Sequence, residues 1–266
     1  MALILKPDIR FRPDRSPLKV WEHPVKGQRY YIGADAARGI EHGDFAAIVG
    51  WNGHTGEQAF RYASRISPEA LAELLYLTGW YWNRAMISVE LTGNLGLWAQ
   101  VKLRDTYRYP NIYRWKGRDD RVPMQMASRV SLGWETNSRT RPMLLAAFRG
   151  GVKYGTCKVR DALILQQMEA AEMEAGRWEI TIGHDDILLA AMIGWIAREQ
   201  WYIAPPLGST SKQLLGEEAK LSPEAEAKQA VPSAQLDDRG QAASHWAKLQ
   251  AYIKRGGPAP KRLEGV

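Results

Sequence analysis

The sequence predicts an α/β fold in which a mixed five-stranded sheet, with its first three strands antiparallel, is flanked by helices on both faces. Three β-prone segments come first, at residues 29–38, 43–52 and 56–64, and short turns join them as hairpins. Helical and extended segments then alternate, which is typical of strands that enter a sheet through helical crossovers. The last strong helical pattern, at residues 184–200, is apolar over most of its length.

The individual elements have local signals. Residues 30–32 are a β-prone Tyr-Tyr-Ile run, and the turn "NGHTG" at residues 52–56 separates the second strand from the third. A helix over residues 67–82 begins with Ser67 as its cap and Pro68 in its first turn. The remaining expected elements are strands at residues 85–90 and 111–115, a loop or hairpin at 116–136, and helices at 94–105, 137–151 and 160–174.

The two ends of the chain differ in composition from its middle. Residues 1–28 contain four prolines and are expected to form an irregular lead-in segment. Residues 29–203 form the predicted domain. Residues 204–266 begin with "APPLGSTSKQ" and are expected to be a linker and a mostly flexible tail, with one helix-forming stretch at 242–254.

Positive charge is concentrated in one region. The whole chain has a net charge of +7, yet residues 100–160 contain 14 Lys and Arg against 4 Asp and Glu, a local excess of 14 − 4 = +10. Tyrosines and tryptophans are interleaved with these charges, which is the composition of a surface that faces nucleic acid. An ordinary solvated basic face would have the same charge pattern.

Composition also argues against several classes of protein. Cys157 is the single cysteine, so neither a disulfide framework nor a cysteine-based zinc site is expected. No stretch approaches the length of a membrane span, and "MALIL" is too short for a signal peptide. A cytoplasmic protein in a reducing compartment is the expectation.

Four acidic residues lie at the ends of apolar elements. Asp35 interrupts the first strand, Glu90 closes the strand at 85–90, and Asp185 and Asp186 open the last helix. One aspartate is enough to cap a helix and to complement its dipole, so the second needs another explanation. Since neighbouring strand ends lie together, a helix that crosses the same edge could bring its first residues there. Turn or surface roles remain open for Asp35 and Glu90 taken singly.

Several carboxylates in one buried place repel one another strongly unless cations bind between them. Carboxylate oxygens are hard ligands that suit Mg²⁺ or Mn²⁺. Two such ions about 3.5–4 Å apart can stabilise both the attacking and the leaving oxygen of a phosphodiester. The acids therefore predict metal-dependent phosphodiester chemistry.

Four motifs, in order, resemble those of one known family. They are "VWEHPVKGQRYYIGADAARGIEHGDFAAIV" (residues 20–49), "VELTGNLG" (89–96), "GWETNSRTRPMLL" (133–145) and "GHDDILLAAMIG" (183–194). Together they resemble the nuclease domain of the large terminase subunit of tailed bacteriophages, which has a ribonuclease H-like fold. The resemblance implies an endonuclease that needs Mg²⁺ or Mn²⁺ and cuts double-stranded DNA concatemers during viral genome packaging.

The resemblance and the placement of the acids assign the same catalytic, metal-binding roles. Asp35 should bridge two ions, while Glu90 and Asp185 each hold one, and Asp186 is either the alternative ligand or its support. Asp44, matched to the family's "GD", either orients a water molecule at the metals or caps a turn. His184 carries protons near neutral pH or caps the helix.

Candidate phosphate contacts lie in the basic region, although each could equally be a solvated surface residue. They are Arg139, Arg141, Lys116, Arg118 and Arg121. The turn at Thr92 and Gly93 is less polar than in many relatives, so no DNA contact is assigned there.

The family's packaging ATPase motif, G-x-x-x-x-G-K-[ST], does not occur in this sequence. The chain is therefore expected to be an excised nuclease domain or a stand-alone subunit. The expected partners are double-stranded DNA, a packaging ATPase domain or subunit, the portal and the small terminase subunit, without a membrane. The expected location is the cytoplasm of the infected bacterial host, for a phage or prophage-encoded protein.

Two other functions use the same features. One is a different ribonuclease H-like DNA enzyme, such as a junction resolvase or a transposase-like enzyme, with the same acids acting on different DNA. The other is a non-catalytic DNA-binding or assembly module of the packaging motor, in which the acids have a structural role.

Overall fold

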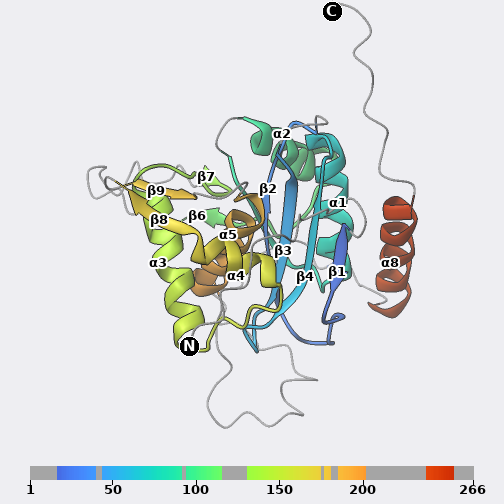
Figure 1. Cartoon of the computed structure of the whole chain (residues 1–266). Helices are drawn as coiled ribbons and strands as arrows, with labels where there is room; N and C mark the ends of the chain where they lie inside the picture. Colours follow the sequence, from blue (N-terminus) through green and yellow to red (C-terminus); the bar gives the residue numbers. More distant parts are fainter. Residues whose placement is uncertain are drawn as a thin grey trace, which may run out of the picture.

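A mixed five-stranded sheet lies at the centre of the protein, with helices on both of its faces (Figure 1). The computed structural model describes residues 17–39, 44–91, 94–115, 131–174, 177–180, 185–201 and 238–254. The predicted fold class is confirmed. In spatial order the strands are β1 (Leu18–Val20), β4 (Gln58–Ser64), β3 (Ala46–Asn52), β2 (Tyr30–Asp35) and β5 (Met86–Val89).

The strand directions follow from the connections. Strands β2, β3 and β4 pair antiparallel in chain order, as hairpin-linked strands do. Strand β5 is parallel to β2, so the chain must cross over after β4, and helix α1 (Pro68–Tyr81) provides this crossover. The start of α1 confirms the prediction, because the Ser67 side chain accepts a hydrogen bond from the amide of Ala70.

One edge of the sheet differs from the prediction. We expected residues 111–115 to form the fifth strand and the lead-in to be irregular throughout. Instead, β1 comes from the lead-in and pairs antiparallel with the outer edge of β4. A three-residue strand is too short for its alternation to be recognised, and the free backbone groups of an edge favour such an addition.

Residues 111–115 lie along the opposite edge, beside β5. The Ile87 amide donates to the carbonyl of Asn111 at 3.0 Å, and the amide of Tyr113 donates to the carbonyl of Ile87 at 2.8 Å. The chain then forms a two-stranded ribbon of β6 (Arg114–Trp115) and β7 (Ser131–Leu132). Strand β6 ends the strand predicted at 111–115, and β7 lies within the loop or hairpin predicted at 116–136, of which residues 116–130 lie outside the described part of the chain.

Alternation along the strands divides the apolar residues between two layers. Tyr30, Ile32 and Ala34 pack on one face with helix α1, and this face is called the α1 face. Tyr31 packs on the other face with helix α5 (Asp186–Trp201), which is called the α5 face. Helices α2 (Leu95–Val101) and α8 (Asp238–Lys254) also cover the α1 face, whereas α3 (Thr140–Lys153) and α4 (Ala162–Glu169) cover the α5 face (Figure 1).

Helix α5 touches β2 backbone to backbone. A Cβ atom at Gly33 would overlap the carbonyl oxygen of Ala190, and one at Gly194 would lie 2.7 Å from the amide nitrogen of Gly33. The indole of Trp51 on β3 donates a 3.0 Å hydrogen bond to the carbonyl of Ala191. These contacts fix how far α5 extends beyond the carboxyl end of β2.

The segment predicted as one helix over 160–174 forms two elements. Helix α4 ends at Glu169. The chain then forms strand β8 (Ala171–Glu174), which pairs with strand β9 (Arg177–Ile180). The guanidinium of Arg149 on α3 donates to the carbonyls of Met168 and Ala171, at 2.9 and 2.7 Å, and so satisfies the end of the helix. The long-helix prediction is therefore wrong after residue 169. A short segment such as residues 170–174 can match both the helical period of 3.6 residues and the strand period of two residues.

The predicted helix-forming stretch at 242–254 lies within α8, which packs against α1. Leu249 and Tyr252 are buried in the layer on the α1 face, and the Tyr252 hydroxyl donates to the carbonyl of Ala70 at 3.1 Å. Trp246 stacks on Tyr81 with ring centroids 4.6 Å apart. The rest of the predicted tail, residues 204–237 and 255–266, lies outside the described residues, and the domain boundaries stay a prediction.

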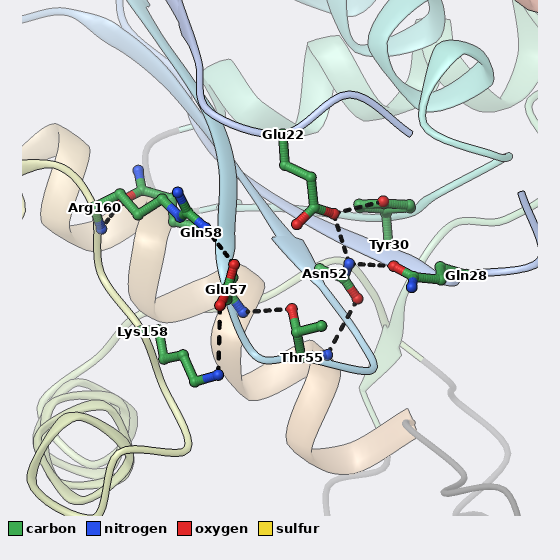
Figure 2. Close-up of polar contacts among 9 residues, drawn as sticks. All are labelled: Glu22, Gln28, Tyr30, Asn52, Thr55, Glu57, Gln58, Lys158 and Arg160. Carbon is green, nitrogen blue, oxygen red and sulfur yellow. Dashed lines mark hydrogen bonds and ion pairs between the residues drawn. The ribbon is translucent and has the colours of Figure 1, made fainter. Parts of the chain in front are cut away.

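A polar network closes the amino-terminal end of β2 (Figure 2). One oxygen of Glu22 accepts hydrogen bonds from the Tyr30 hydroxyl at 2.7 Å and from the Asn52 amide at 2.6 Å, and Gln28 also accepts from Asn52. Nearby, Glu57 pairs with Lys158 and Arg160, which ties β4 to the segment before α4. The polar groups of this network satisfy one another's hydrogen bonds, so this end of the sheet is structural.

No helix in the described ranges is long and apolar enough to cross a membrane.

The contact between α5 and β2 makes a testable prediction. Gly33→Ala should lower the free energy of unfolding by at least about 1–3 kcal/mol, because the added methyl group has no space. Gly150→Ala in α3 is the matched control, since a Cβ there meets nothing within 4 Å and should stabilise the helix by up to about 1 kcal/mol. Urea denaturation measures both, and equal stability of the two variants would contradict the packing described.

Candidate active site

Asp35 and Glu90 lie side by side at the carboxyl ends of two parallel strands. Asp35 is the last residue of β2, and Glu90 directly follows β5. Ala34 is in register with Val89, and the Glu90 amide donates to the carbonyl of Ala34 at 2.9 Å. The two acids therefore occupy neighbouring positions at one edge, as the sequence predicts.

Both acidic side chains are on the α5 face of the sheet. Side chains alternate along a strand, and Tyr31 of β2 packs on the α5 face, so Asp35 falls on the same side. On β5, Ile87 and Val89 pack on the α1 face, which places Glu90 on the α5 face as well. Asp35 is half-buried, and Glu90 is only 5% exposed.

The start of helix α5 brings the aspartate pair to this edge. Asp186 is the first residue of α5 and is only 7% exposed. Its Oδ2 accepts a 2.8 Å hydrogen bond from the backbone amide of Phe45, directly before β3. Because β3 pairs with β2, this bond holds Asp186 beside the strand that ends in Asp35.

Asp185 has a different partner, the guanidinium of Arg141 in the first turn of α3. Arg141 is one of the candidate phosphate contacts expected from the sequence, and in this structure it forms an ion pair with a site carboxylate. The preceding turn is ordered by its own hydrogen bonds, in which Asn137 accepts from the amide of Thr140 at 2.9 Å and Thr140 donates to the carbonyl of Glu135 at 2.8 Å. Arg139 lies in this turn and is exposed.

The electrostatics of Asp35 connect all four acids. Burial raises the pKa of Asp35 well above its usual value, and the carboxylates of Asp186, Glu90 and Asp185 raise it further, in that order. The acids at the ends of β2 and β5 and at the start of α5 therefore interact at one edge of the sheet. Asp186 contributes more than Asp185, although the sequence slightly favoured Asp185 as a ligand.

The four acidic side chains are of the type that binds divalent cations, but they are not arranged as a complete set of ligands. In the described part of the chain, no group of three or more His, Cys, Asp or Glu side chains is arranged to hold an ion. The aspartates at the start of α5 instead interact with the Phe45 amide and with Arg141. Four hard oxygen donors with mutual repulsion fit Mg²⁺ or Mn²⁺, which would neutralise them.

Of the other predicted site residues, Asp44 lies in the described part of the chain and four do not. Asp44 is exposed and directly precedes Phe45, so it is one residue from the amide that binds Asp186. Its role in orienting water stays a prediction. Four predicted residues lie outside the described residues: Lys116, Arg118, Arg121 and His184.

Sequence reasoning missed two features of the site. A Cβ at Gly96 would overlap the carbonyl oxygen of Glu90, so this glycine allows α2 to begin directly against the acid. The only sequence signal was a glycine in the first turn of a helix, where alanine is favoured. The pairing of Arg141 with Asp185 was also missed, because no spacing rule connects residues so far apart in the chain.

No family model and no curated protein matches this chain. Several solved structures share its fold, including the following three. The large terminase nuclease from thermophilic phage G20c with bound magnesium is 17% identical over 68% of this chain and 88% of that chain, with a TM-score of 0.52. The same nuclease with bound cobalt gives 16% identity, the same coverage and a TM-score of 0.52. The Thermus phage P74-26 large terminase nuclease domain is 15% identical over 70% of this chain and 87% of that chain, with a TM-score of 0.50.

These comparisons confirm the predicted resemblance at the level of the fold. The protein shares the fold of these phage large terminase nucleases, and the low identity limits the comparison to that architecture.

The repulsion at Asp35 predicts a stability change. In metal-free buffer Asp35→Asn should raise the melting temperature, by about 2–4 °C for each kcal/mol of repulsion removed. Because the folded-state pKa of Asp35 is raised above its unfolded-state value, the wild-type protein loses stability as the pH rises through the folded pKa. The advantage of the variant should therefore grow with pH.

Thermal melting in EDTA between about pH 5 and pH 8 measures this difference. Asp105→Asn is the control, since Asp105 is exposed and pairs with Arg104 away from the other acids. A melting temperature of Asp35→Asn below that of the wild type would contradict the electrostatic account.

Proposed function

We propose that this protein is a metal-dependent endonuclease that cuts double-stranded concatemeric viral DNA during genome packaging. The observation that carries the proposal is that Asp35, Glu90 and the aspartates of α5 gather at one sheet edge, in a fold shared with large terminase nucleases. The reaction would be two-metal-ion hydrolysis of a phosphodiester, without a protein nucleophile.

The proposed ligands of the two Mg²⁺ or Mn²⁺ ions are Asp35, Glu90, Asp186 and Asp185. The bound ions would activate water and stabilise the charge that develops at phosphorus. Asp186 is the stronger candidate for the ion shared with Asp35, because it contributes more to the electrostatic repulsion at Asp35 and the Phe45 amide holds it in place. Solved neighbours with bound magnesium and cobalt support divalent metal use.

The proposed DNA contacts begin beside the acids, at the start of α3. Arg139 and Arg141 lie there, and Lys116, Arg118 and Arg121 belong to the same basic region of the sequence. Phosphate contacts by such side chains give affinity that falls with salt and depends little on sequence.

The proposed role in genome packaging is supported by the similarity in fold to solved structures of phage terminase nucleases. The proposed partners are a packaging ATPase domain or subunit, the portal and the small terminase subunit. The proposed location is the cytoplasm of the infected bacterium.

The assignment of the acids is tested by cleavage of supercoiled plasmid. Asp35→Asn should reduce Mn²⁺-dependent nicking at least about a hundredfold, because loss of a direct ligand should cost no less than the loss of a group that supports one. Asp105→Asn removes an exposed carboxylate elsewhere and should nick at the wild-type rate. Nicking by Asp35→Asn at the wild-type rate would refute the metal assignment.

The substrate separates the terminase assignment from its alternatives. Linear duplex and supercoiled plasmid should be cut at least as well as a four-way junction. A strong preference for the junction would indicate a resolvase. DNA binding without cleavage in Mg²⁺ or Mn²⁺ would indicate a non-catalytic module.

A further inference from the structure

We propose that Arg141 is an internal counter-ion of Asp185 that competes with the metal and couples metal binding to DNA binding. The inference rests on the proposed function and goes beyond it, because it gives the adjacent aspartates different roles. Asp186 would be held for the metal, and Asp185 would alternate between Arg141 and the metal. Arg141 is thus a positioning residue.

The ion pair has the geometry of a contact that can open. The side chain of Arg141 is 35% exposed and that of Asp185 is 25% exposed, so both are accessible to solvent ions. The backbone on the Arg141 side is fixed, because Thr140 is buried and bonded within the turn. The guanidinium can therefore leave Asp185 by side-chain rotation, without movement of α3.

The guanidinium of Arg141 and a divalent metal ion repel each other and compete for the carboxylate of Asp185. A carboxylate that pairs with a guanidinium has part of its charge neutralised, and a divalent ion at the same group would repel the arginine. Binding of an ion to Asp185 must therefore displace Arg141 or share the carboxylate with it. In either case the ion pair lowers the metal affinity of the DNA-free protein.

DNA phosphate is the natural second partner of the guanidinium. Arginine binds phosphate and carboxylate with the same fork of N–H donors. Arg141 lies two residues from the exposed Arg139, at the edge that contains the acids. A phosphate that takes Arg141 releases Asp185 for the metal, so DNA should raise metal affinity and, by thermodynamic linkage, metal should raise DNA affinity equally.

Titration of Mn²⁺, with free Mn²⁺ measured by electron paramagnetic resonance, tests this coupling. Without DNA, Arg141→Gln should bind Mn²⁺ about two- to fivefold more tightly than the wild type, which is the range expected for a partly exposed ion pair. A short duplex with phosphorothioate linkages should tighten Mn²⁺ binding to the wild type and should do so much less for Arg141→Gln.

Arg139→Gln is the matched control, because it removes the same charge two residues away without breaking the ion pair. In the titration without DNA, it should leave the Mn²⁺ affinity near the wild-type value, as should Arg141→Lys, which keeps the charge. Equal or weaker Mn²⁺ binding by Arg141→Gln would overturn the inference. Failure of the wild type to bind Mn²⁺ at all would instead refute the proposed function.

A second measurement does not depend on the folding of Arg141→Gln. In EDTA, Asp185→Asn frees Arg141 and should bind the duplex more tightly than Asp186→Asn, although both remove one negative charge from the start of α5. Equal duplex affinities of these two variants would also overturn the inference.

Discussion

Helix α5 lies against β2 with backbone touching backbone at Gly33 and Gly194, and this contact sets where the first residues of α5 lie relative to Asp35 and Glu90. A larger residue at either place would push the helix away from the sheet and move its first turn with it. The indole of Trp51 bonds to the same helix from β3, so two neighbouring strands hold it. The helix start thus meets the carboxyl ends of β2 and β5, where Asp35 and Glu90 already lie together.

The fold places like charges together, and the surrounding groups limit the cost. The Phe45 amide bonds to Asp186 and the guanidinium of Arg141 pairs with Asp185, while burial and then the neighbouring carboxylates raise the pKa of Asp35. A divalent cation would remove that repulsion and would supply phosphodiester chemistry at the same place. The adjacent aspartates then have a physical explanation, since a backbone amide holds Asp186 and the guanidinium of Arg141 pairs with Asp185.

Local patterns predicted the elements that carry the site. The hairpin-linked strands, the capped start of α1 and the apolar pattern of α5 follow from turn residues, a Ser-Pro start and periodicity. The sequence also predicted the acids at strand and helix ends. It could not predict β1, the strand after α4 or the packing of α8, because these depend on a free edge, on the Arg149 contacts and on aromatic contacts between α1 and α8. The different partners of Asp185 and Asp186 are likewise set by tertiary contacts.

The central claim is that acids distant in sequence form one pocket for divalent cations. A crystal soaked in Mn²⁺ and measured for anomalous scattering tests it most directly. The account predicts anomalous density in contact with Asp35, Glu90 and Asp186, at the end of β2 under the start of α5. Ordered side chains with no anomalous density between them, at a Mn²⁺ concentration that supports plasmid nicking, would contradict it.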